Sequence, residues 1–336
     1  MIYPDAATVA AVGEDPQSAD IPELHKAVFR WLEKFVNTSW DASAEDLEQL
    51  RAHGASDSDI AEMLNMASLQ VYLVSIADAG GIPLESELED SGSALSEFSS
   101  LHRDRSYYHD RDAQSPQVSA SFERRLQKQA RIADAGDAAS DGWLSAPCSG
   151  DAYEAAATKA KSRYGLMPKL FSAISACADF YPRHQLALDL LEQPHSTSLS
   201  PSLHALARAA TVALDQCDYF VPTITVHLQH RFEGDIQYPD LLPEPRSLAR
   251  NDQEQVVLAF AEKLVRFPYK IVDKDAQGFR DVGLDDAAYV DVFNTVALQC
   301  SLDRLANCLG VNADSRPLLS NAFMAATASA AREQTG

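Results

Sequence analysis

The chain is poor in positive charge, and it contains no long run of purely apolar residues. Its 28 Lys and Arg residues are outnumbered by 49 Asp and Glu residues, which gives a formal net charge of −21 at pH 7. A surface this negative repels phosphate backbones and anionic lipid headgroups, so we expect neither nucleic acid nor a membrane as a partner. No apolar run approaches the roughly 18 residues that span a bilayer, and the first residues show no signal-peptide pattern.

Cysteine pairs of the zinc-binding CxxC type are also missing. The five cysteines are Cys148, Cys177, Cys217, Cys300 and Cys308. An odd number in a chain of this size favours buried free thiols in a reducing cytoplasm over a disulfide framework. We therefore expect a cytoplasmic protein, and we expect it to hold neither a metal ion nor a cofactor.

Glycine is scarce, with 14 residues, and no segment alternates between apolar and polar residues as an exposed strand does. The long segments are instead rich in Ala, Leu, Glu, Gln and Arg, whose side chains lose little freedom in a helix. The sequence therefore predicts an all-α fold. With 336 residues, the chain has room for two ordinary domains, or for one domain and a partial copy.

The most informative feature of the chain is an internal repeat. Residues 28–82 align without a gap onto residues 257–311, at a fixed offset of 229 positions (257 minus 28). The apolar periodicity of each copy predicts three helices, of which the second ends at a glycine and the third begins after the N-cap residue Ser56 or Asp285. Identical pairs include Glu33/Glu262, Lys34/Lys263, Asp46/Asp275, Arg51/Arg280, Gly54/Gly283, Asp57/Asp286, Asn65/Asn294 and Gly81/Gly310.

The repeat and the composition divide the chain into four parts. Residues 1–84 form an N-terminal half-copy, and residues 85–150 form a polar linker with one charged helix near residues 122–133. Residues 151–320 form a complete domain that contains the second copy, and residues 321–336 form a C-terminal tail. We expect the two copies to fold alike and to pack around a common core.

Several short motifs follow one another in a fixed order along residues 165–311. They are Gly165–Pro168 (GLMP), Ser198–Pro201 (SLSP), Cys217–Phe220 (CDYF), Phe260–Leu264 (FAEKL), Phe279–Gly283 (FRDVG) and Asn294–Ala297 (NTVA). In combination they resemble the alkylhydroperoxidase D-like and carboxymuconolactone decarboxylase superfamily, particularly its peroxidase-related branch. Residues 28–82 resemble the closing half of the same domain. The resemblance implies an all-helical alkylhydroperoxidase D-like fold that assembles into homo-oligomers.

The peroxidase motif of that superfamily is incomplete in this chain. Its peroxidases use a Cys-x-x-Cys pair with a preceding Glu and a following His that relay protons. Cys217 stands at the first cysteine position, whereas Phe220 stands at the second. Ile224 stands at the His position and Ala205 at the Glu position. The proton relay and the resolving thiol are therefore both missing.

A peroxidatic cysteine must be a thiolate, and its sulfenic acid must be resolved by another thiol. The resemblance therefore predicts a peroxidase-related oxidoreductase with an incomplete thiol site centred on Cys217. His227, Asp215 and Tyr219 complete the candidate catalytic set. The expected substrate is a small molecule, an organic peroxide, with a thiol as the reductant.

Two other functions stay open at this point. A cofactor-free lyase of the carboxymuconolactone decarboxylase type would use His227, Asp215 or Tyr219 as acid and base on a small organic acid. A catalytically silent binding or assembly module of the same fold would need none of these groups, and Cys217 would then be a small buried residue of the core.

Overall fold

The fold is all-helical, as the composition predicts. The computed structural model describes residues 5–82, 142–144, 151–174, 181–192, 194–232, 245–321 and 323, and these residues form helices and loops without a β-strand. The predicted helix near residues 122–133, nearly all of the 85–150 linker and nearly all of the 321–336 tail lie outside the described residues.

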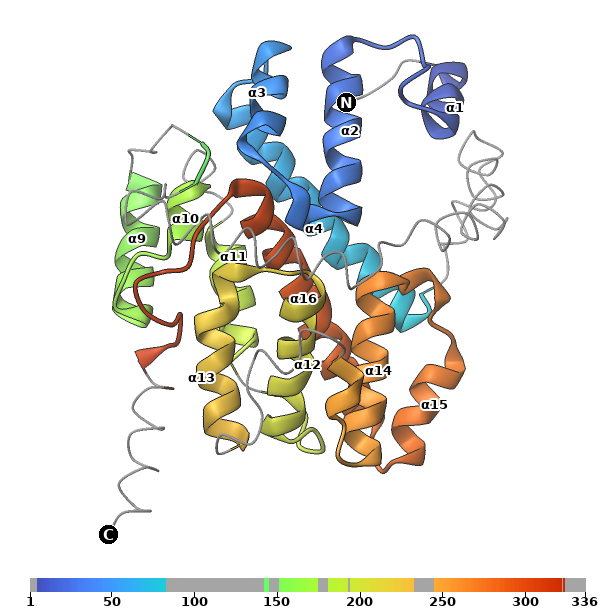
Figure 1. Cartoon of the computed structure of the whole chain (residues 1–336), viewed down its shortest axis with the longest axis vertical. Coiled ribbons are helices and arrows are strands. Elements are labelled where there is room, and N and C mark those ends of the chain that lie inside the picture. The colour runs from blue at the N-terminus through green and yellow to red at the C-terminus, as the bar shows by residue number, and fades with distance from the viewer. Residues whose placement is uncertain are drawn as a thin grey trace.

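Among the described residues, four helices precede the linker and the other described helices follow it (Figure 1). The first group is α1 (Ala6–Glu14), α2 (Glu23–Asn37), α3 (Ala44–Ala52) and α4 (Asp57–Gly80), with the 3-10 turn η1 (Ser39–Asp41). The second group begins with α9 (Asp151–Tyr164), α10 (Lys169–Ala173), α11 (Tyr181–Leu190), α12 (Pro201–Leu214), η4 (Asp218–Phe220) and α13 (Val221–Phe232). It ends with η6 (Pro245–Leu248), α14 (Asp252–Arg266), η7 (Pro268–Lys270), α15 (Asp273–Asp281) and α16 (Asp286–Leu309).

The helices begin where local sequence signals place them. Ser56 caps α4 by accepting a hydrogen bond from the backbone N–H of Asp59, and Asp285 caps α16 in the same way through Ala288. Because the first turn of a helix has unsatisfied N–H groups, a side-chain acceptor at this position stabilises the helix. The predicted N-cap residues of the third helix are therefore confirmed in both copies.

The helices of the two copies have the same bounds at the offset of 229. The ends of α2, η1, α3 and α4 fall 229 positions before the ends of α14, η7, α15 and α16. The turn after the second helix contains Gly54 in one copy and Gly283 in the other, with φ angles of 99° and 82°. Glycine adopts this left-handed backbone without steric cost, which explains its presence at both positions.

The two copies also share their polar contacts. Lys34 binds both carboxylate oxygens of Asp46 at 2.6 and 2.8 Å, and Lys263 binds Asp275 at the same two distances. In each copy this ion pair connects the first helix to the second. The two segments are therefore matching packing units, and their origin by duplication stays a prediction.

Helices α4 and α16 pack along each other at the centre of the molecule (Figure 1). α16 is buried along most of its length, because α12 and α14 pack against it as well. On α4, by contrast, Met66, Leu73 and Val74 are 52%, 48% and 42% exposed. No described helix covers α4 as α12 covers α16.

Among the described residues, α4 alone has the length and composition of a membrane-spanning helix. An interior helix meets the same criterion, and α4 lies against α16 with 39% of its most apolar window buried. α4 is not an uninterrupted apolar run, because Asn65, Ser68 and Gln70 lie among its apolar residues without adding charge.

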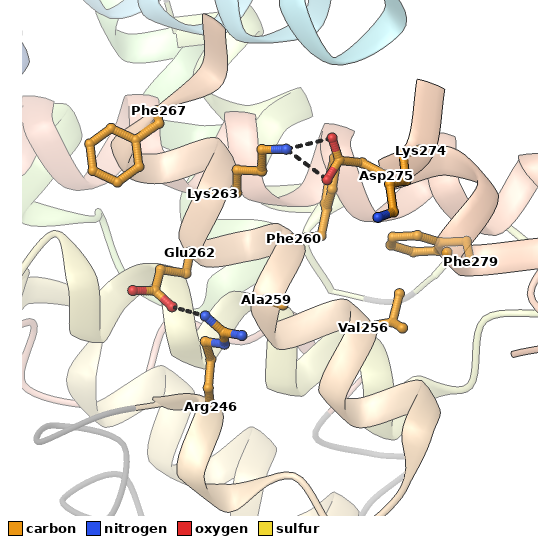
Figure 2. A pocket seen from close by; sticks show the side chains of 11 residues that line it. Arg246, Val256, Ala259, Phe260, Glu262, Lys263, Phe267, Lys274, Asp275 and Phe279 are labelled. Carbon is orange, nitrogen blue, oxygen red and sulfur yellow. Dashed lines mark hydrogen bonds and ion pairs between the residues drawn. The ribbon is translucent and has the colours of Figure 1, made fainter. Parts of the chain in front are cut away.

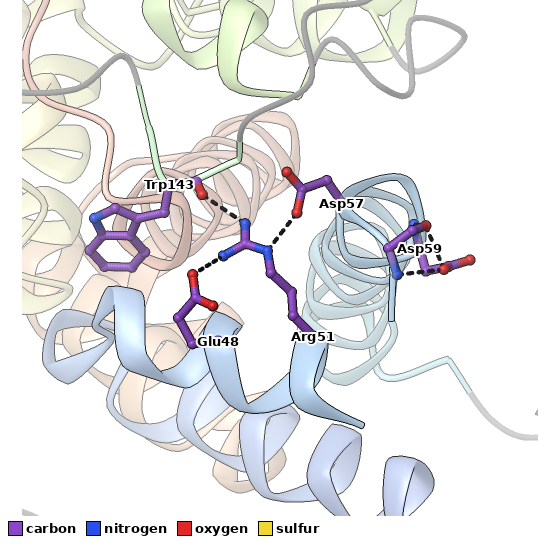
Figure 3. A network of polar contacts seen from close by, with 6 residues as sticks. Glu48, Arg51, Asp57, Asp59 and Trp143 are labelled. Carbon is purple, nitrogen blue, oxygen red and sulfur yellow. Dashed lines mark hydrogen bonds and ion pairs between the residues drawn. The ribbon is translucent and has the colours of Figure 1, made fainter. Parts of the chain in front are cut away.

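A polar network ties the first copy to the short segment at residues 142–144 (Figure 3). The guanidinium of Arg51 binds Asp57 at 2.7 Å and Glu48 at 2.7 Å, and it donates to the backbone oxygen of Trp143 at 2.8 Å. The N–H of Trp143 in turn donates to the backbone oxygen of Leu309 at 2.9 Å. This segment therefore links α3 to the end of α16.

We expect alanine at Gly310 to destabilise the protein more than alanine at the equivalent Gly81. Both glycines end their helices in the left-handed conformation, with φ near 60°, which costs an alanine about 1–2 kcal/mol. A Cβ at Gly81 meets open space, whereas a Cβ at Gly310 overlaps the indole of Trp143. Overpacking adds roughly 1–3 kcal/mol to the cost of Gly310→Ala. Urea denaturation of the two variants measures the difference, and equal losses would contradict the contact with Trp143.

Candidate functional site

The candidate cysteine lies in the turn between α12 and α13. Asp215 ends α12, and Gln216 follows with a left-handed φ of 50°, the only positive φ of a non-glycine residue in the described chain. The N–H of Cys217 then returns to the backbone oxygen of Val212 at 3.1 Å. This tight reversal turns both Asp215 and Cys217 inward, toward α16.

Cys217 has no access to solvent. Its exposed fraction is 0%, and burial raises the pKa of its thiol well above the usual value. An ionised Asp303 would raise that pKa further, and backbone N–H groups of Phe220 and Tyr219 offset only part of the shift. Because burial in a dry environment opposes a thiolate, Cys217 stays protonated at neutral pH.

Asp215 is held by three groups of α16. The thiol of Cys300 donates to its Oδ2 at 2.8 Å, and Nε of Arg304 lies 3.5 Å from its Oδ1. Nδ2 of Asn307 donates to the backbone oxygen of Asp215 at 2.9 Å. Burial raises the pKa of Asp215 even though Arg304 opposes the shift. Two of these contacts engage the carboxylate, and because the side chain is 1% exposed, a substrate in solution has no access to it.

A second buried carboxylate, Asp303, lies in the same cluster. Its Oδ1 accepts a hydrogen bond from Nε2 of Gln299 at 2.7 Å, and its Oδ2 has no hydrogen-bond partner among the described residues. Burial raises the pKa of Asp303 well above the usual value, and the charge of Asp215 raises it further. Two acids in one dry cluster compete for ionisation, so Asp303, which lacks a direct cation partner, is the one that keeps its proton.

Arg208 of α12 extends the cluster toward α13. Its Nε donates to Oε1 of Gln299 at 3.1 Å, and one terminal nitrogen donates to the backbone oxygen of Leu191 at 2.6 Å. The same nitrogen lies 3.3 Å from Nε2 of His227. Burial lowers the pKa of Arg208 to about 10, which leaves the guanidinium charged at neutral pH.

His227 is buried beside Arg208, and its ring also packs against Phe323 at 4.7 Å between ring centroids. Burial lowers its pKa well below the usual value, and the positive charge of Arg208 lowers it further. The imidazole is therefore neutral, and its hydrogen-bonding contact is with Arg208 rather than with Cys217.

Tyr219 faces a different neighbour. Its hydroxyl donates to Oδ2 of Asp314 at 2.6 Å, while Oδ1 of Asp314 accepts from the backbone N–H of Lys169. Burial and the charge of Asp314 raise the pKa of Tyr219 well above the usual value. Tyr219 thus connects the η4 turn to the start of α10 and to the segment after α16.

The structure thus brings together only part of the predicted set. Asp215 and Cys217 share one buried cluster with Cys300, Asp303 and Arg304. His227 reaches that cluster through Arg208 and Gln299, and Tyr219 binds outside it. None of the four predicted residues lines the larger cavity, of about 450 Å³, or the smaller one, of about 100 Å³.

The polar residues of α16 were not predicted as part of the site. Gln299, Asp303, Arg304 and Asn307 interrupt the most buried helix of the chain, and the matching positions of α4 are Gln70, Val74, Ser75 and Asp78. A signal was available in the sequence, because an acid and an arginine inside an otherwise apolar helix require buried partners. Among the described residues, no three His, Cys, Asp or Glu side chains gather to hold a metal ion.

The chain matches no protein-family model, no curated protein and no solved structure.

Proposed function

We propose that this chain is a catalytically silent binding module, in which the position used for thiol chemistry has become part of the core. The observation that carries the proposal is the burial of Cys217, which has an exposed fraction of 0% and a raised pKa. The resemblance to the alkylhydroperoxidase D-like superfamily supplies the expected fold, and fold alone does not determine function.

Thiol peroxidation requires a thiolate that the peroxide can reach. Cys217 lacks access to solvent, and the acidic side chain of Asp303 beside it does not favour a thiolate. Cys300, the other thiol of the cluster, is 3% exposed and donates a hydrogen bond to Asp215. Neither sulfur therefore meets the requirements of a peroxidatic cysteine.

Lyase chemistry requires an acid and a base that line a cavity. Asp215, His227 and Tyr219 are all buried, and each is engaged by another protein group. Their contacts hold α12, α13 and α16 together, which is a structural role. The lyase alternative is therefore less well supported than the silent module.

Thiol labelling together with peroxide consumption tests the proposal. In a Cys148→Ser/Cys177→Ser background, only the buried Cys217, Cys300 and Cys308 remain. We expect Cys217 to be labelled at least ~10³-fold more slowly in the native protein than in urea, because a reagent reaches it only through rare opening of the fold. Peptide mass spectrometry assigns the label to each cysteine.

The same protein is then offered organic peroxides with a dithiol reductant. We expect equal and negligible consumption by this background protein and by its Cys217→Ser variant. Rapid native labelling of Cys217 would contradict its burial, and peroxide turnover that disappears in Cys217→Ser would support the peroxidase-related oxidoreductase that the resemblance implies.

A further inference from the structure

We propose that the groove between α14 and α15 binds a small organic monoanion with an aromatic or branched apolar body. This inference rests on the proposed binding function and gives it a site and a ligand class. It is tested by ligand binding rather than by thiol reactivity, so either proposal can fail without the other.

The groove has the size and lining of a small-molecule site. Its volume is about 450 Å³, and ligand pockets in proteins commonly measure roughly 300–1,000 Å³. Val256, Ala259 and Phe260 line it from α14, and Phe279 lines it from α15 (Figure 2). The rings of Phe260 and Phe279 meet edge to face, with 5.4 Å between centroids, and they lie beneath the groove with exposed fractions of 3% and 0%.

The charges of the groove favour an anion. Lys263 is already neutralised by Asp275, in a contact that recurs as Lys34–Asp46 in the first copy and is therefore structural. Lys274 is exposed on the α15 side, beside Phe279, and makes no ion pair with any of the described residues (Figure 2). It is a free cation next to an apolar wall, in a chain whose net charge is −21.

Arg246 provides a second positive group on the opposite side of the groove (Figure 2). It lies 3.6 Å from Glu262, but Glu262 also binds Arg266 at the shorter distance of 2.6 Å. The carboxylate of Glu262 thus forms ion pairs with two arginines, and the charge of Arg246 is only partly neutralised. The net formal charge of the side chains that line the groove is +1. Three of them are basic (Arg246, Lys263 and Lys274) and two are acidic (Glu262 and Asp275). This net charge suits a monoanion.

Comparison of the two copies shows which residues open the groove. At the offset of 229, Ala259 and Gly278 correspond to Arg30 and Gln49, and Lys274 corresponds to Glu45. The second copy therefore has small side chains where the first has long ones, and a positive charge where the first has a negative one. The three differences act together to create space and to favour an anion.

Gly278 adds an independent argument. It lies inside α15, its φ is not in the left-handed range, and a Cβ placed on it meets no atom within 4 Å. Neither backbone conformation nor crowding requires glycine here, although glycine costs about 1 kcal/mol relative to alanine inside a helix. An empty position that weakens its own helix fits a site that must stay open for a ligand.

Binding of 4-phenylbutyrate and of its neutral amide, measured by calorimetry and by ligand-observed NMR, tests the proposal. We expect the acid to bind at least about tenfold more tightly than the amide, because a charge-assisted contact with Lys274 is lost in the amide. Lys274→Glu should weaken binding of the acid by about tenfold or more. Lys159→Glu, which makes the same charge change at an exposed position of α9, should leave binding unchanged.

Gly278→Gln introduces the residue of the first copy and should abolish binding by filling the groove. Its helical content and thermal midpoint should not fall, because glutamine favours a helix over glycine and the first copy accommodates it at Gln49. Equal binding by Lys274→Glu and Lys159→Glu, or full binding by Gly278→Gln, would overturn the assignment. So would the absence of binding by 4-phenylbutyrate, benzoate and isovalerate at millimolar concentrations.

Discussion

Replacing Arg304 by methionine is expected to lower the free energy of unfolding by about 3–5 kcal/mol. Methionine retains much of the apolar volume of the arginine but removes its charge. Asp215, whose side chain is 1% exposed, then remains buried without a cation. The protein must either keep an unpaired charge in its interior or protonate the carboxyl group at neutral pH, and both are costly. Urea denaturation at pH 7 measures the loss.

A matched control is available on the protein surface. Arg280→Met removes the ion pair with Asp286, whose side chains are 47% and 71% exposed. Because water solvates both groups after the substitution, we expect little change in stability from this variant. If Arg304→Met and Arg280→Met had similar midpoints of urea denaturation, the buried ion pair of Arg304 with Asp215 would not contribute to stability.

The second large effect concerns pH. In the folded protein, burial and the charge of Asp215 raise the pKa of Asp303, whereas in the unfolded chain this carboxyl loses its proton near pH 4. Between these two pKa values the folded state binds more protons than the unfolded state. The contribution of Asp303 to the free energy of unfolding must therefore fall as pH rises through this window.

Asp303→Asn resembles the protonated carboxyl group in shape and does not titrate. As pH rises, we expect the free energy of unfolding of the variant to increase relative to that of the wild type. The increase is up to about 1.4 kcal/mol per pH unit, as long as Asp303 of the folded wild type keeps its proton. Denaturation curves of both proteins at pH 4.5, 5.5, 6.5 and 7.5 give the difference at each pH. Asp286→Asn changes an exposed side chain, and its free energy of unfolding should vary with pH as that of the wild type does.

Two other outcomes would contradict this account of Asp303. A constant difference between Asp303→Asn and the wild type across the pH range would mean that the carboxyl has an ordinary pKa in the folded state. If the free energy of unfolding of the wild type instead increased relative to that of the variant as pH rises, Asp303 would be ionised. Arg208 would then stabilise its charge through Gln299.

The helical fold and the ends of α4 and α16 followed closely from local sequence patterns. Ser56 and Asp285 identified the starts of α4 and α16, and Gly81 and Gly310 end those helices in the left-handed conformation. Such signals work because a cap satisfies backbone groups within a few residues of itself. The equivalence of the two copies was visible for the same reason, since both carry matching caps and turns at a constant offset.

The candidate site was predicted only in part. Asp215 and Cys217 are neighbours in the sequence and share a buried cluster, which their closeness made plausible. Cys300 and Arg304, which contact Asp215, and Asp303, which affects the pKa of Cys217, lie more than 80 positions later in the sequence. They belong to another helix, α16. Helical periodicity placed these residues on α16 but did not indicate which helix would cover them.

The sequence by itself determined that the chain is helical, where α4 and α16 begin and end, and that residues 28–82 match residues 257–311. Only the tertiary structure decided that Cys217 has no solvent access and that Asp303 and Arg304 are buried. Val74, at the position of the first copy equivalent to Asp303, is 42% exposed. The physical reason is that hydrogen bonds and caps depend on near neighbours, whereas burial depends on distant segments. Helix α12 covers α16, and no described helix covers α4 in the same way.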